Sequence, residues 1–485
     1  MNSARQQASV VVVGAGPTGL WLARELAVAG IEVRVLEKNV ERAPFVRAMG
    51  IQARTLEILE MRGVLERFLE QGRRFPYANV AGLYPWLSLE GMDTTCPYAL
   101  LLRQSLVEEL LEKSLTELGV QVEHGRQLAS VEPRDGHVLL RLADGAVIEA
   151  TYAVGCDGAH STVRKQAGIG FPGFDSTMTY LLADVVVQAP PPNLDDEAGF
   201  AWYDHGHGGW VGGGRLPDGQ YRLMVADARS AAVPQHHPVS IEEFRATLTR
   251  ITGSDLGVHS PSWLSRVGNS SRLAERYRAG RVLLAGDAAH VHSPFGGQGL
   301  NTGIQDATNL GWKLAAVLRG DAAEDLLDTY HAERHPIGEA VIANTMAQTS
   351  MVFDFTPAGA RHRELFSQLL ELPQANRYLA GQITALDYAY PPGDPSAHPL
   401  IGTRVPDLTL DSPLTDRLFP LLHDTNHVLL NLTDSPVQLP APGPVRTVPA
   451  RLTAPRQHWQ PYPDAVLIRP DGYIAAVSAS SEPIT

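Results

Sequence analysis

Two separated stretches of the chain show the hydrophobic pattern of a strand followed by a helix. Near the start, Ser9 to Val13 is a mostly β-branched run, typical of a strand buried on both faces of a parallel sheet. After a glycine-rich turn, apolar residues recur at helical spacing from Leu20 to Ala29, and Gly30 follows where a positive φ ends a helix. Residues 31–36 then alternate as a second strand. The start of the chain therefore predicts a β-α-β unit.

The second strand-to-helix passage lies far downstream. Residues 281–285 predict a strand, and one helical face follows it, formed by Ile304, Ala307, Gly311, Leu314, Ala315 and Leu318. Between the two passages, residues near 180–230 alternate as short strands, including 221–225 after the turn Pro217-Asp218-Gly219. We interpret this part as a β-rich domain inserted into a discontinuous nucleotide-binding domain.

The C-terminal part of the chain has a different composition. Fifteen of the 35 prolines lie between Pro391 and Pro463, which predicts a linker and a loop-rich segment. Strands are expected at 427–432, 465–468 and 473–477, so a small third domain is predicted. The predicted domains are a discontinuous nucleotide-binding domain (1–178 and 268–390), a β-rich substrate-binding domain (179–267) and a C-terminal domain (391–485).

Composition and charge exclude several classes of protein. The 485 residues include 40 Lys+Arg and 53 Asp+Glu, which gives a formal net charge of −13. This charge argues against a protein that binds the phosphate backbone of a nucleic acid. None of the four lysines follows a glycine, so a phosphate-binding Walker loop is excluded. Two cysteines cannot build a four-ligand zinc site or a disulfide framework. With no secretory leader or membrane span expected, we predict a cytoplasmic protein.

A dinucleotide-binding motif follows the first strand. Gly14-Ala15-Gly16-Pro17-Thr18-Gly19 matches G-x-G-x-x-G, and Glu37 lies 18 residues after Gly19, where an acid can accept a hydrogen bond from a ribose hydroxyl. The first glycine makes the turn, the second lets the backbone approach a pyrophosphate, and the third allows close helix packing. This motif alone does not distinguish FAD from NAD(P).

A second glycine-rich segment, residues 292–301, ends where the downstream helix begins. The N-terminus of a helix offers unpaired N–H groups and positive potential, which suits the anionic edge of a reduced flavin. Without other evidence, a plain glycine-rich loop entering a helix would be the better explanation of the segment.

Three ordered motifs identify a family. The chain resembles the FAD-dependent aromatic hydroxylases built on the para-hydroxybenzoate hydroxylase fold, in the branch that contains aromatic polyketide hydroxylases and rifampicin monooxygenase. The motifs are residues 14–19, then Gly155-Cys156-Asp157-Gly158 through Arg164, then Ala285-Gly286-Asp287 through His290 running into Gly299-Leu300-Asn301. The resemblance covers most of the chain and is thinnest after about residue 400. It implies an α/β fold with a Rossmann-like FAD-binding domain, an inserted β-rich domain and a small thioredoxin-like C-terminal domain.

The resemblance also implies how the cofactors bind. FAD would be tightly but non-covalently bound, with Glu37 on the adenosine ribose and Asp287 on the ribityl chain, and NAD(P)H would be a transient co-substrate without a separate Rossmann domain. Asp157 and Gly158 match a motif that serves FAD and, transiently, NAD(P)H. The expected cofactor-binding set is Gly14, Gly16, Thr18, Gly19, Glu37, Lys38, Arg47, Arg103, Gln104, Asp157, Gly158, Asp287, Pro294, Gly297, Gly299, Leu300 and Asn301.

The implied reaction is the insertion of one oxygen atom from O2 into an electron-rich ring by a flavin C4a-hydroperoxide. The protein must then exclude water from the reactive flavin, and Pro294 and Phe295 are the candidates for the wall on the oxygen side. The expected substrate is a bulky polycyclic aromatic or polyketide-derived molecule, and the protein is expected to be a monomer or a homodimer.

Two features of the sequence depart from the pattern of the family. The tail lacks a Cys-x-x-Cys pair, so a thioredoxin-like fold there would be redox-silent. Met49 stands where a second arginine tends to occur in rifampicin enzymes, which argues against rifampicin as the substrate.

The inserted domain supplies candidates for substrate contacts. Trp202, Tyr203, Trp210 and Arg215 could line an aromatic cleft, although most such aromatic residues are simply core. His205 and His207 lack a further ligand nearby, so a hairpin turn is expected there and no metal site. His290 and His292 are expected to stabilise their loop, and hydrolase motifs are absent. Baeyer–Villiger insertion, epoxidation and flavin binding without turnover stay open as alternatives.

Overall fold

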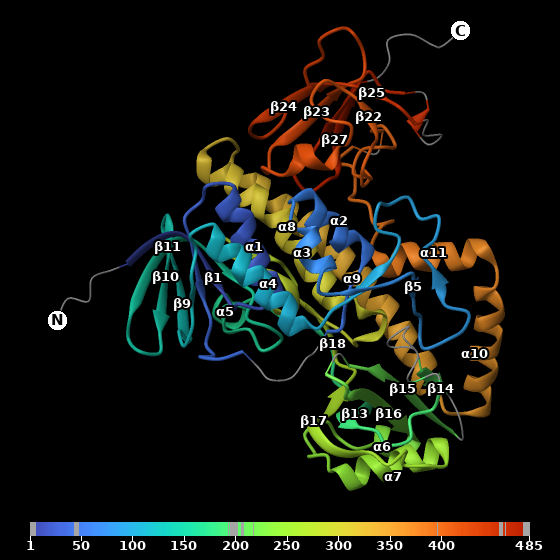
Figure 1. Ribbon diagram of the computed structural model, residues 1–485. Helices are drawn as coiled ribbons and strands as arrows, with labels where there is room; N and C mark the ends of the chain where they lie inside the picture. The colour runs from blue at the N-terminus through green and yellow to red at the C-terminus, as the bar shows by residue number, and fades with distance from the viewer. Residues whose placement is uncertain are drawn as a thin grey trace.

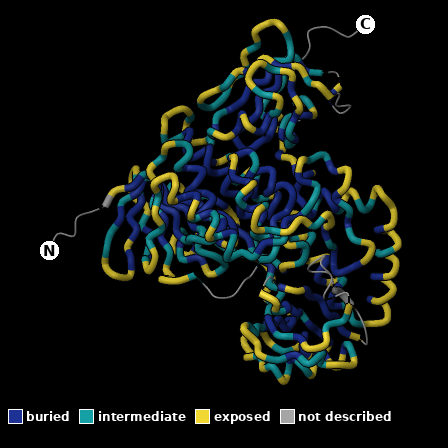
Figure 2. Tube along the Cα trace, in the orientation of Figure 1, coloured by how far each residue is buried: buried dark blue, intermediate teal, exposed yellow. Residues whose placement is uncertain are grey.

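A computed structural model describes residues 6–42, 48–192, 194, 202–204, 208–216, 218–394, 396–454, 459–460 and 462–478. It contains a mixed α/β body built around a sheet with parallel strands, a separate antiparallel sheet and a C-terminal domain (Figure 1). Figure 2 shows that the buried residues gather inside each of these parts.

The largest sheet has eight strands and is parallel at its centre. Strand β11 runs through its middle: residues 147–150 pair with β10, and residues 153–155 pair with β20 on the same edge. The spatial order is β19 (Arg278–Ala279), β20 (Val282–Leu284), β11 (Val147–Gly155), β1 (Gln6–Val13), β2 (Val33–Leu36) and β8 (Val122–Glu123), with β10 (His137–Leu142) and β9 (Leu128–Arg134) as an antiparallel extension of β11. The predicted β-α-β start and the predicted strand at 281–285 are confirmed.

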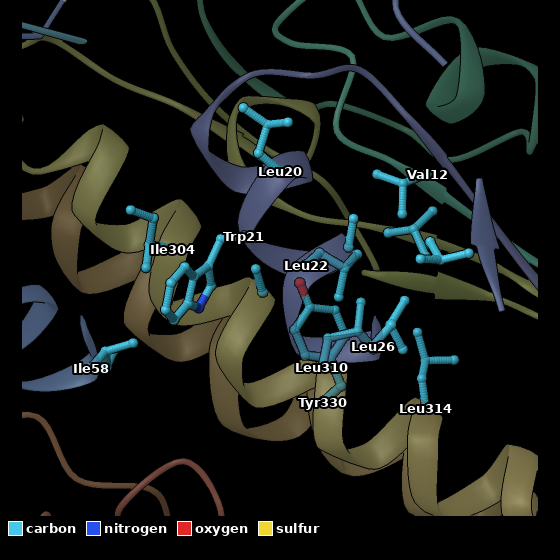
Figure 3. Close-up of a cluster of buried hydrophobic side chains, with 14 of the residues drawn as sticks. Val12, Leu20, Trp21, Leu22, Leu26, Ile58, Ile304, Leu310, Leu314 and Tyr330 are labelled. Atoms are coloured by element: carbon cyan, nitrogen blue, oxygen red, sulfur yellow. The ribbon is translucent and has the colours of Figure 1, made fainter. Parts of the chain in front are cut away.

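Helices α1 (Pro17–Val28) and α8 (Gly299–Arg319) pack against each other over this sheet (Figure 3). Trp21 is fully buried and donates through Nε1 to Thr308 Oγ1 at 2.8 Å. A Cβ on Gly311 would lie 2.6 Å from that of Glu25, so glycine permits this close approach of the two helices. At the end of α1, Gly30 has φ +76°, as the sequence predicts. Because α1 and α8 both begin at the cavity described below, their packing fixes the positions of two glycine-rich turns.

A five-stranded antiparallel sheet lies beside this body, within residues 179–268. Its order is β14 (Trp202–Asp204), β15 (Gly209–Arg215), β16 (Tyr221–Asp227), β13 (Thr179–Val186) and β17 (His259–Gly268). Alternation divides the strands into two faces: Leu181, Leu223 and Val225 pack on α7 (Ile241–Thr252), whereas Tyr180 and Leu182 point to the opposite face. The second face is turned toward the cavity.

Smaller strands and further helices complete the described part of the body. The strands are β3 (Gly50–Ile51), β4 (Arg73–Phe75), β7 (Ala99–Leu101), the hairpin of β5 (Tyr77–Ala78) and β6 (Leu87–Ser88), and β12 (Gly173–Phe174), β18 (Ser271–Leu273) and β21 (His290–Val291). The helices are α2 (Ala53–Met61), α3 (Leu65–Leu69), α4 (Gln104–Glu117), α5 (Thr162–Gln166), α6 (Ala228–Ala231), α9 (Asp328–Phe353), α10 (Pro357–Leu370) and α11 (Pro373–Thr384).

The C-terminal domain contains a four-stranded sheet in the order β24 (Val445–Pro449), β23 (His427–Asn431), β26 (Ala465–Ile468) and β27 (Ile474–Ser478), and a two-stranded sheet of β22 (Leu410–Asp411) and β25 (Arg451–Leu452). The β26–β27 turn docks on the body: Arg62 donates to Pro470 O at 2.9 Å, and Arg54 donates to Asp471 O at 2.6 Å. Arg469 forms an ion pair with Glu333 of α9 at 2.8 Å. The predicted strands of the tail are confirmed within one or two residues.

Candidate functional site

One continuous cavity of about 1140 Å³ lies between the two sheets. Its walls include the turns after β1, β11 and β20, the N-terminal end of α8 and the inner face of the five-stranded sheet. Crevices at the carboxyl ends of parallel strands are the usual ligand sites of α/β sheets. The cavity therefore joins a region with the features of a dinucleotide site to a second, more apolar chamber.

The three glycines of the first motif have three different surroundings. Gly14 has φ +107°, and a Cβ there would lie 2.3 Å from Cys156 O. At Gly19 a Cβ would lie 2.0 Å from Gly14 O, so this glycine lets α1 approach the turn. Nothing lies within 4 Å of a Cβ built on Gly16, which borders the cavity. The open space beside Gly16 is therefore available to a ligand.

Helix α1 begins at this open space. Gly16 is its N-cap residue and provides no side-chain hydrogen bond, and the first turn of the helix carries no acidic residue, so the positive end of the helix is directed at the cavity. Thr18 also lines the cavity, and Gly286 and Gly303 make room for it: a Cβ on either would lie 2.7 or 2.2 Å from Thr18 Oγ1. Such a helix end favours a phosphate group.

Glu37 and Lys38 follow β2 and line the same end of the cavity. The Glu37 carboxylate accepts hydrogen bonds from Ala15 N at 3.0 Å and from Asn39 N at 2.9 Å. These bonds fix the carboxylate beside the glycine turn, the position that suits a ribose hydroxyl.

The turn Gly286-Asp287 lies beside Thr18, and Asp287 borders the cavity. Asp287 is exposed there, whereas a buried cluster supports the turn from beneath. Asp306 Oδ2 accepts from Gly286 N at 3.1 Å and contacts His290 Nε2 at 2.7 Å, and its other oxygen accepts from Arg334 at 2.8 Å. Arg334 and His290 hold the pKa of Asp306 below its usual value despite burial. His290 thus supports the loop, in agreement with the sequence-based expectation.

Asp157 borders the cavity at the end of β11. Its Oδ2 accepts from Thr162 N at 2.6 Å and Val163 N at 3.2 Å, which caps α5. The buried Oδ1 has no hydrogen-bond partner among the described residues. A buried carboxylate oxygen without a partner is costly and marks a place where a bound donor would be favourable.

The glycine-rich segment before α8 is held by two amide side chains. Asn301 donates to Gly297 O at 2.8 Å and accepts from Gln52 N at 2.8 Å. Gln52 in turn donates through Nε2 to Gly296 O at 3.1 Å. Gly296 and Gly297 have φ values of +78° and +62°, so this crossed pair of amides stabilises a turn that favours glycine. The N-terminus of α8 is thereby fixed at the cavity.

His292 lines the cavity beside this segment. Burial lowers the pKa of its imidazole, and Nδ1 lies 2.8 Å from Ser293 O. A neutral ring is therefore favoured in this part of the cavity.

The second chamber has aromatic and apolar walls. Tyr180, Trp210 and Phe295 form a cluster with ring centroids 5.7 to 6.4 Å apart. Phe75 and Tyr77 contribute from the body of the protein, and the remaining wall includes Ala78, Ala99, Leu101, Leu182 and Met224. Burial raises the pKa of Tyr180, which keeps its phenol neutral. Such walls favour a flat, apolar ligand.

One buried cation lies in the aromatic chamber. Arg222 is 2 % exposed, and its Nε and Nη2 donate to the two oxygens of Asp184 at 2.7 Å each. Its guanidinium also lies 5.0 Å from the centre of the Trp263 ring. The bidentate pair makes this arginine a rigid polar group in an otherwise apolar wall.

The predicted site residues fall into four groups. Those that border the cavity are Gly14, Gly16, Thr18, Glu37, Lys38, Gln104, Asp157, Gly158, Trp210, Asp287, Pro294, Phe295, Gly297, Gly299 and Leu300. Those placed elsewhere are Gly19 and Asn301, which act within the turns, Arg103, which forms an ion pair with Asp218 at 3.4 Å, and the exposed Arg215. Arg47, a predicted cofactor contact, lies outside the described residues, as do His205 and His207, where the sequence predicts a hairpin turn. Of Trp202 and Tyr203 only the backbone is described, and β14 pairs Tyr203 with Gly212.

Sequence reasoning missed Gln52, Phe75, Tyr77, Tyr180 and Arg222. Strand alternation could have revealed Tyr180 and Arg222. It places residues 180, 182 and 184 on one face of the sheet, and Arg222 pairs with Asp184 on that face. Phe75 and Tyr77 lie on short strands of three and two residues, where periodicity is too brief to be recognised.

The residues present fit a bound FAD. The cavity offers a glycine turn with open space, a helix N-terminus for phosphates, an acid for a ribose and a second helix N-terminus beside the apolar chamber. Within the described ranges no group of three or more His, Cys, Asp or Glu residues could hold a metal ion. None of the described helices is long and apolar enough to cross a membrane.

Comparisons with known families agree with this chemistry. A family model described as "FAD binding domain" matches residues 7–345, and one described as "Aromatic-ring hydroxylase, C-terminal" matches residues 398–484. The chain is 45 % identical over 483 residues to "Uncharacterized aromatic compound monooxygenase YhjG" of Bacillus subtilis, covering 97 % of this chain and 94 % of the relative. It is 41 % identical over 469 residues to a rifampicin monooxygenase of Streptomyces venezuelae, covering 96 % and 94 %.

A solved structure is also similar along nearly the whole chain. The OxyS anhydrotetracycline hydroxylase from Streptomyces rimosus superposes with a TM-score of 0.87 at 41 % identity, covering 98 % of this chain and 96 % of that one.

Proposed function

This chain belongs to the FAD-binding aromatic-ring hydroxylase family as an FAD-dependent aromatic-compound monooxygenase, and we propose that it consumes NAD(P)H to insert one oxygen atom of O2 into a bulky polycyclic aromatic or polyketide-derived substrate. The single observation that carries the proposal is that one cavity contains both ends of the site. Its dinucleotide end, which we call the cradle, is formed by the glycine turns at residues 14–19 and 296–299 with Glu37 and Asp287, and it is continuous with the aromatic chamber. A cofactor that activates oxygen and a flat substrate can therefore meet without crossing solvent.

We assign the cofactor to the cradle by the features of each residue. The turn at Gly14, Gly16 and Thr18 would hold the pyrophosphate, Glu37 and Lys38 the adenosine, and Asp287 the ribityl hydroxyls. Gly297, Gly299 and Leu300 would border the flavin ring, with Asn301 and Gln52 holding their backbone. The reduced flavin, when bound, supplies the electrons that activate O2 for transfer of one oxygen atom.

The chain's own residues must keep the reacting region dry and orient the substrate. Phe295 packs on Trp210 at 5.7 Å and on Tyr180 at 6.4 Å between ring centroids, so its ring gives the passage between the glycine segment and the aromatic chamber an apolar wall that disfavours water. Pro294 rigidifies the same wall from its exposed side. Arg222 offers a fixed cation, which suits a phenolate or enolate oxygen at the edge of a substrate.

The names of two relatives indicate which classes of substrate to compare. OxyS is named for anhydrotetracycline and another relative for rifampicin. Met49 borders the cavity of this chain, where rifampicin enzymes tend to have an arginine, and this favours a flat polycyclic ring system over rifampicin.

We propose the domain boundaries that the sequence predicts. Residues 1–178 and 268–390 would bind FAD, residues 179–267 would bind the substrate, and residues 391–485 would form the C-terminal domain. In the C-terminal sheet the parallel pair β23–β24 adjoins the antiparallel strands β26 and β27, which supports a thioredoxin-like strand order. Neither cysteine lies in it, so a redox role for this domain is not proposed.

Purified protein tests the proposal. We expect a yellow protein with one non-covalent FAD, NAD(P)H oxidation accelerated by a member of a panel of anthracycline, angucycline and tetracycline precursors, and a product heavier by one oxygen atom. A ring-expanded lactone or an epoxide would shift the assignment to Baeyer–Villiger insertion or epoxidation. Bound flavin with no stimulated NAD(P)H oxidation across the panel would contradict the proposed reaction.

A further inference from the structure

A cluster of four aromatic rings continues the chamber wall toward the surface. Phe75 contacts Tyr77 at 5.7 Å and Trp86 at 5.1 Å between ring centroids, and Tyr77 contacts Trp86 at 5.8 Å, all edge-to-face. Tyr84 stacks on Trp86 at 5.3 Å with an angle of 20° between the rings. We call these four residues the aromatic platform.

The platform spans the boundary between cavity and solvent. Phe75 and Tyr77 belong to the cavity wall, whereas Trp86 and Tyr84 lie beyond it. Tyr77 is 40 % exposed and Tyr84 is 47 % exposed. Large exposed aromatic side chains that adjoin an apolar cavity indicate a ligand-binding surface more than a hydrophobic core.

The backbone that carries the platform is held in place. Asn376 of α11 accepts from Ser88 N at 2.9 Å and donates to Trp86 O at 3.0 Å, so the β5–β6 hairpin is fastened to that helix (Figure 1). Beneath the rings, Ala78 and Leu87 are buried in the same hydrophobic cluster as Trp210. The exposed rings are therefore presented by a fixed scaffold, which reduces the entropy lost when a ligand stacks on them.

We propose that the aromatic platform is an entry subsite on which a planar polycyclic substrate stacks before it moves into the chamber. The inference rests on the proposed function, because it assigns the class of substrate to the mouth of that cavity. Exposed ring faces and edges at the mouth attract a flat aromatic molecule through stacking and edge contacts, whereas a single small ring would gain little from them. The platform thereby selects for size before the reaction begins.

The test uses the oxidised, FAD-loaded protein without NAD(P)H, so that binding is measured apart from turnover. The probes are a planar tricycle, a hydroxyanthraquinone, and a single ring, 4-hydroxybenzoate, with binding followed by stopped-flow perturbation of the flavin absorbance. The variants are Tyr77→Leu and Tyr84→Leu, which keep an apolar side chain but remove a ring. Tyr378→Leu is the matched control, because Tyr378 is a 63 % exposed tyrosine of α11 that is outside both the cavity wall and the platform.

We expect each platform variant to slow the association of the tricycle by roughly 2- to 12-fold, the range of one aromatic contact, because the subsite is occupied on the way in, whereas the Kd, which depends on the final complex, should change less. The Kd of 4-hydroxybenzoate, the Kd of FAD and the control variant should stay unchanged. A tricycle that binds wild type and both variants alike would overturn the platform while leaving the proposed function intact, as would a change confined to dissociation. A wild-type protein that binds no polycyclic aromatic would overturn both.

Discussion

The two halves of the cavity are built in different ways. The cradle for the dinucleotide relies largely on backbone: Gly14, Gly16 and Gly19 act by lacking a side chain, and α1 acts through its N-terminus. The chamber consists of side chains that come from the five-stranded sheet, the β4–β6 region and the segment before α8. A backbone site tolerates almost no substitution at its few positions, whereas a side-chain site can be remodelled residue by residue. The difference explains how one family keeps its cofactor and changes its substrate.

The largest expected effect is on the free energy of unfolding, and it concerns the ion pair of Arg222 and Asp184, which lies in the chamber wall and joins strands β16 and β13. Arg222→Met leaves the buried Asp184 without its bidentate partner, and breaking such a pair costs about 3–5 kcal/mol. Thermal or urea unfolding of the variant measures this loss. The double variant Arg222→Met/Asp184→Asn should recover most of it, and equal stability of the single and wild-type proteins would refute a structural role for the pair.

Substitutions of two glycines in the cradle distinguish a role in helix packing from a role in leaving space for the ligand. Gly19→Ala places a Cβ 2.0 Å from Gly14 O, so we expect a loss of about 1–3 kcal/mol or more of unfolding free energy. Gly16→Ala meets no protein atom within 4 Å and should leave the apoprotein folded, yet weaken FAD binding because the methyl group occupies the space of the pyrophosphate. Unfolding curves of the apoproteins and FAD titrations distinguish the two. Tight FAD binding by Gly16→Ala would contradict the cradle.

Asp287→Ala should lose most of the bound FAD without loss of stability. Asp287 is exposed at the cavity, and a charge-assisted bond from a ribityl hydroxyl is worth about 1.5–3 kcal/mol, or roughly 10- to 100-fold in Kd. The flavin content of the purified variant and its FAD titration provide the measurement. Stoichiometric flavin after purification would remove Asp287 from the cofactor site.

Glu37→Gln should produce the smallest effect. The amide can still accept from Ala15 N and from a ribose hydroxyl, but as a neutral acceptor, so the Kd of FAD should rise only by about 2- to 10-fold. Glu37→Ala should weaken binding further and still fold. Unchanged FAD dissociation constants in both variants would count against the ribose assignment.

The two halves also differ in how far the sequence predicted them. The β1-α1-β2 unit, the positive φ of Gly30 and the separate roles of the three glycines follow from short sequence patterns, although the backbone that Gly14 approaches, at Cys156, comes from a distant part of the chain. The start of α8 was equally accessible, since a glycine segment precedes its apolar face.

The chamber could not be predicted in the same way. Trp210 was recognised by composition, but Tyr180 reaches the same cavity as Phe75 and Tyr77 only through tertiary folding, from a segment about 100 residues away. Arg222 on a strand would ordinarily be expected at the surface, and only its pairing with Asp184 across β13 and β16 makes its burial possible. Likewise, the buried bonds from Arg54 and Arg62 to the β26–β27 turn join residues about 400 positions apart.

In the proposed reaction, cradle and chamber act together on one oxygen molecule. The most direct test supplies FAD-loaded protein with NAD(P)H, a polycyclic aromatic substrate and dioxygen enriched in the heavy isotope, followed by mass spectrometry of the product. We predict that the product carries one labelled oxygen atom on an intact ring system. A product whose added oxygen comes from unlabelled water, or NAD(P)H consumed only to hydrogen peroxide with every substrate tested, would contradict the account.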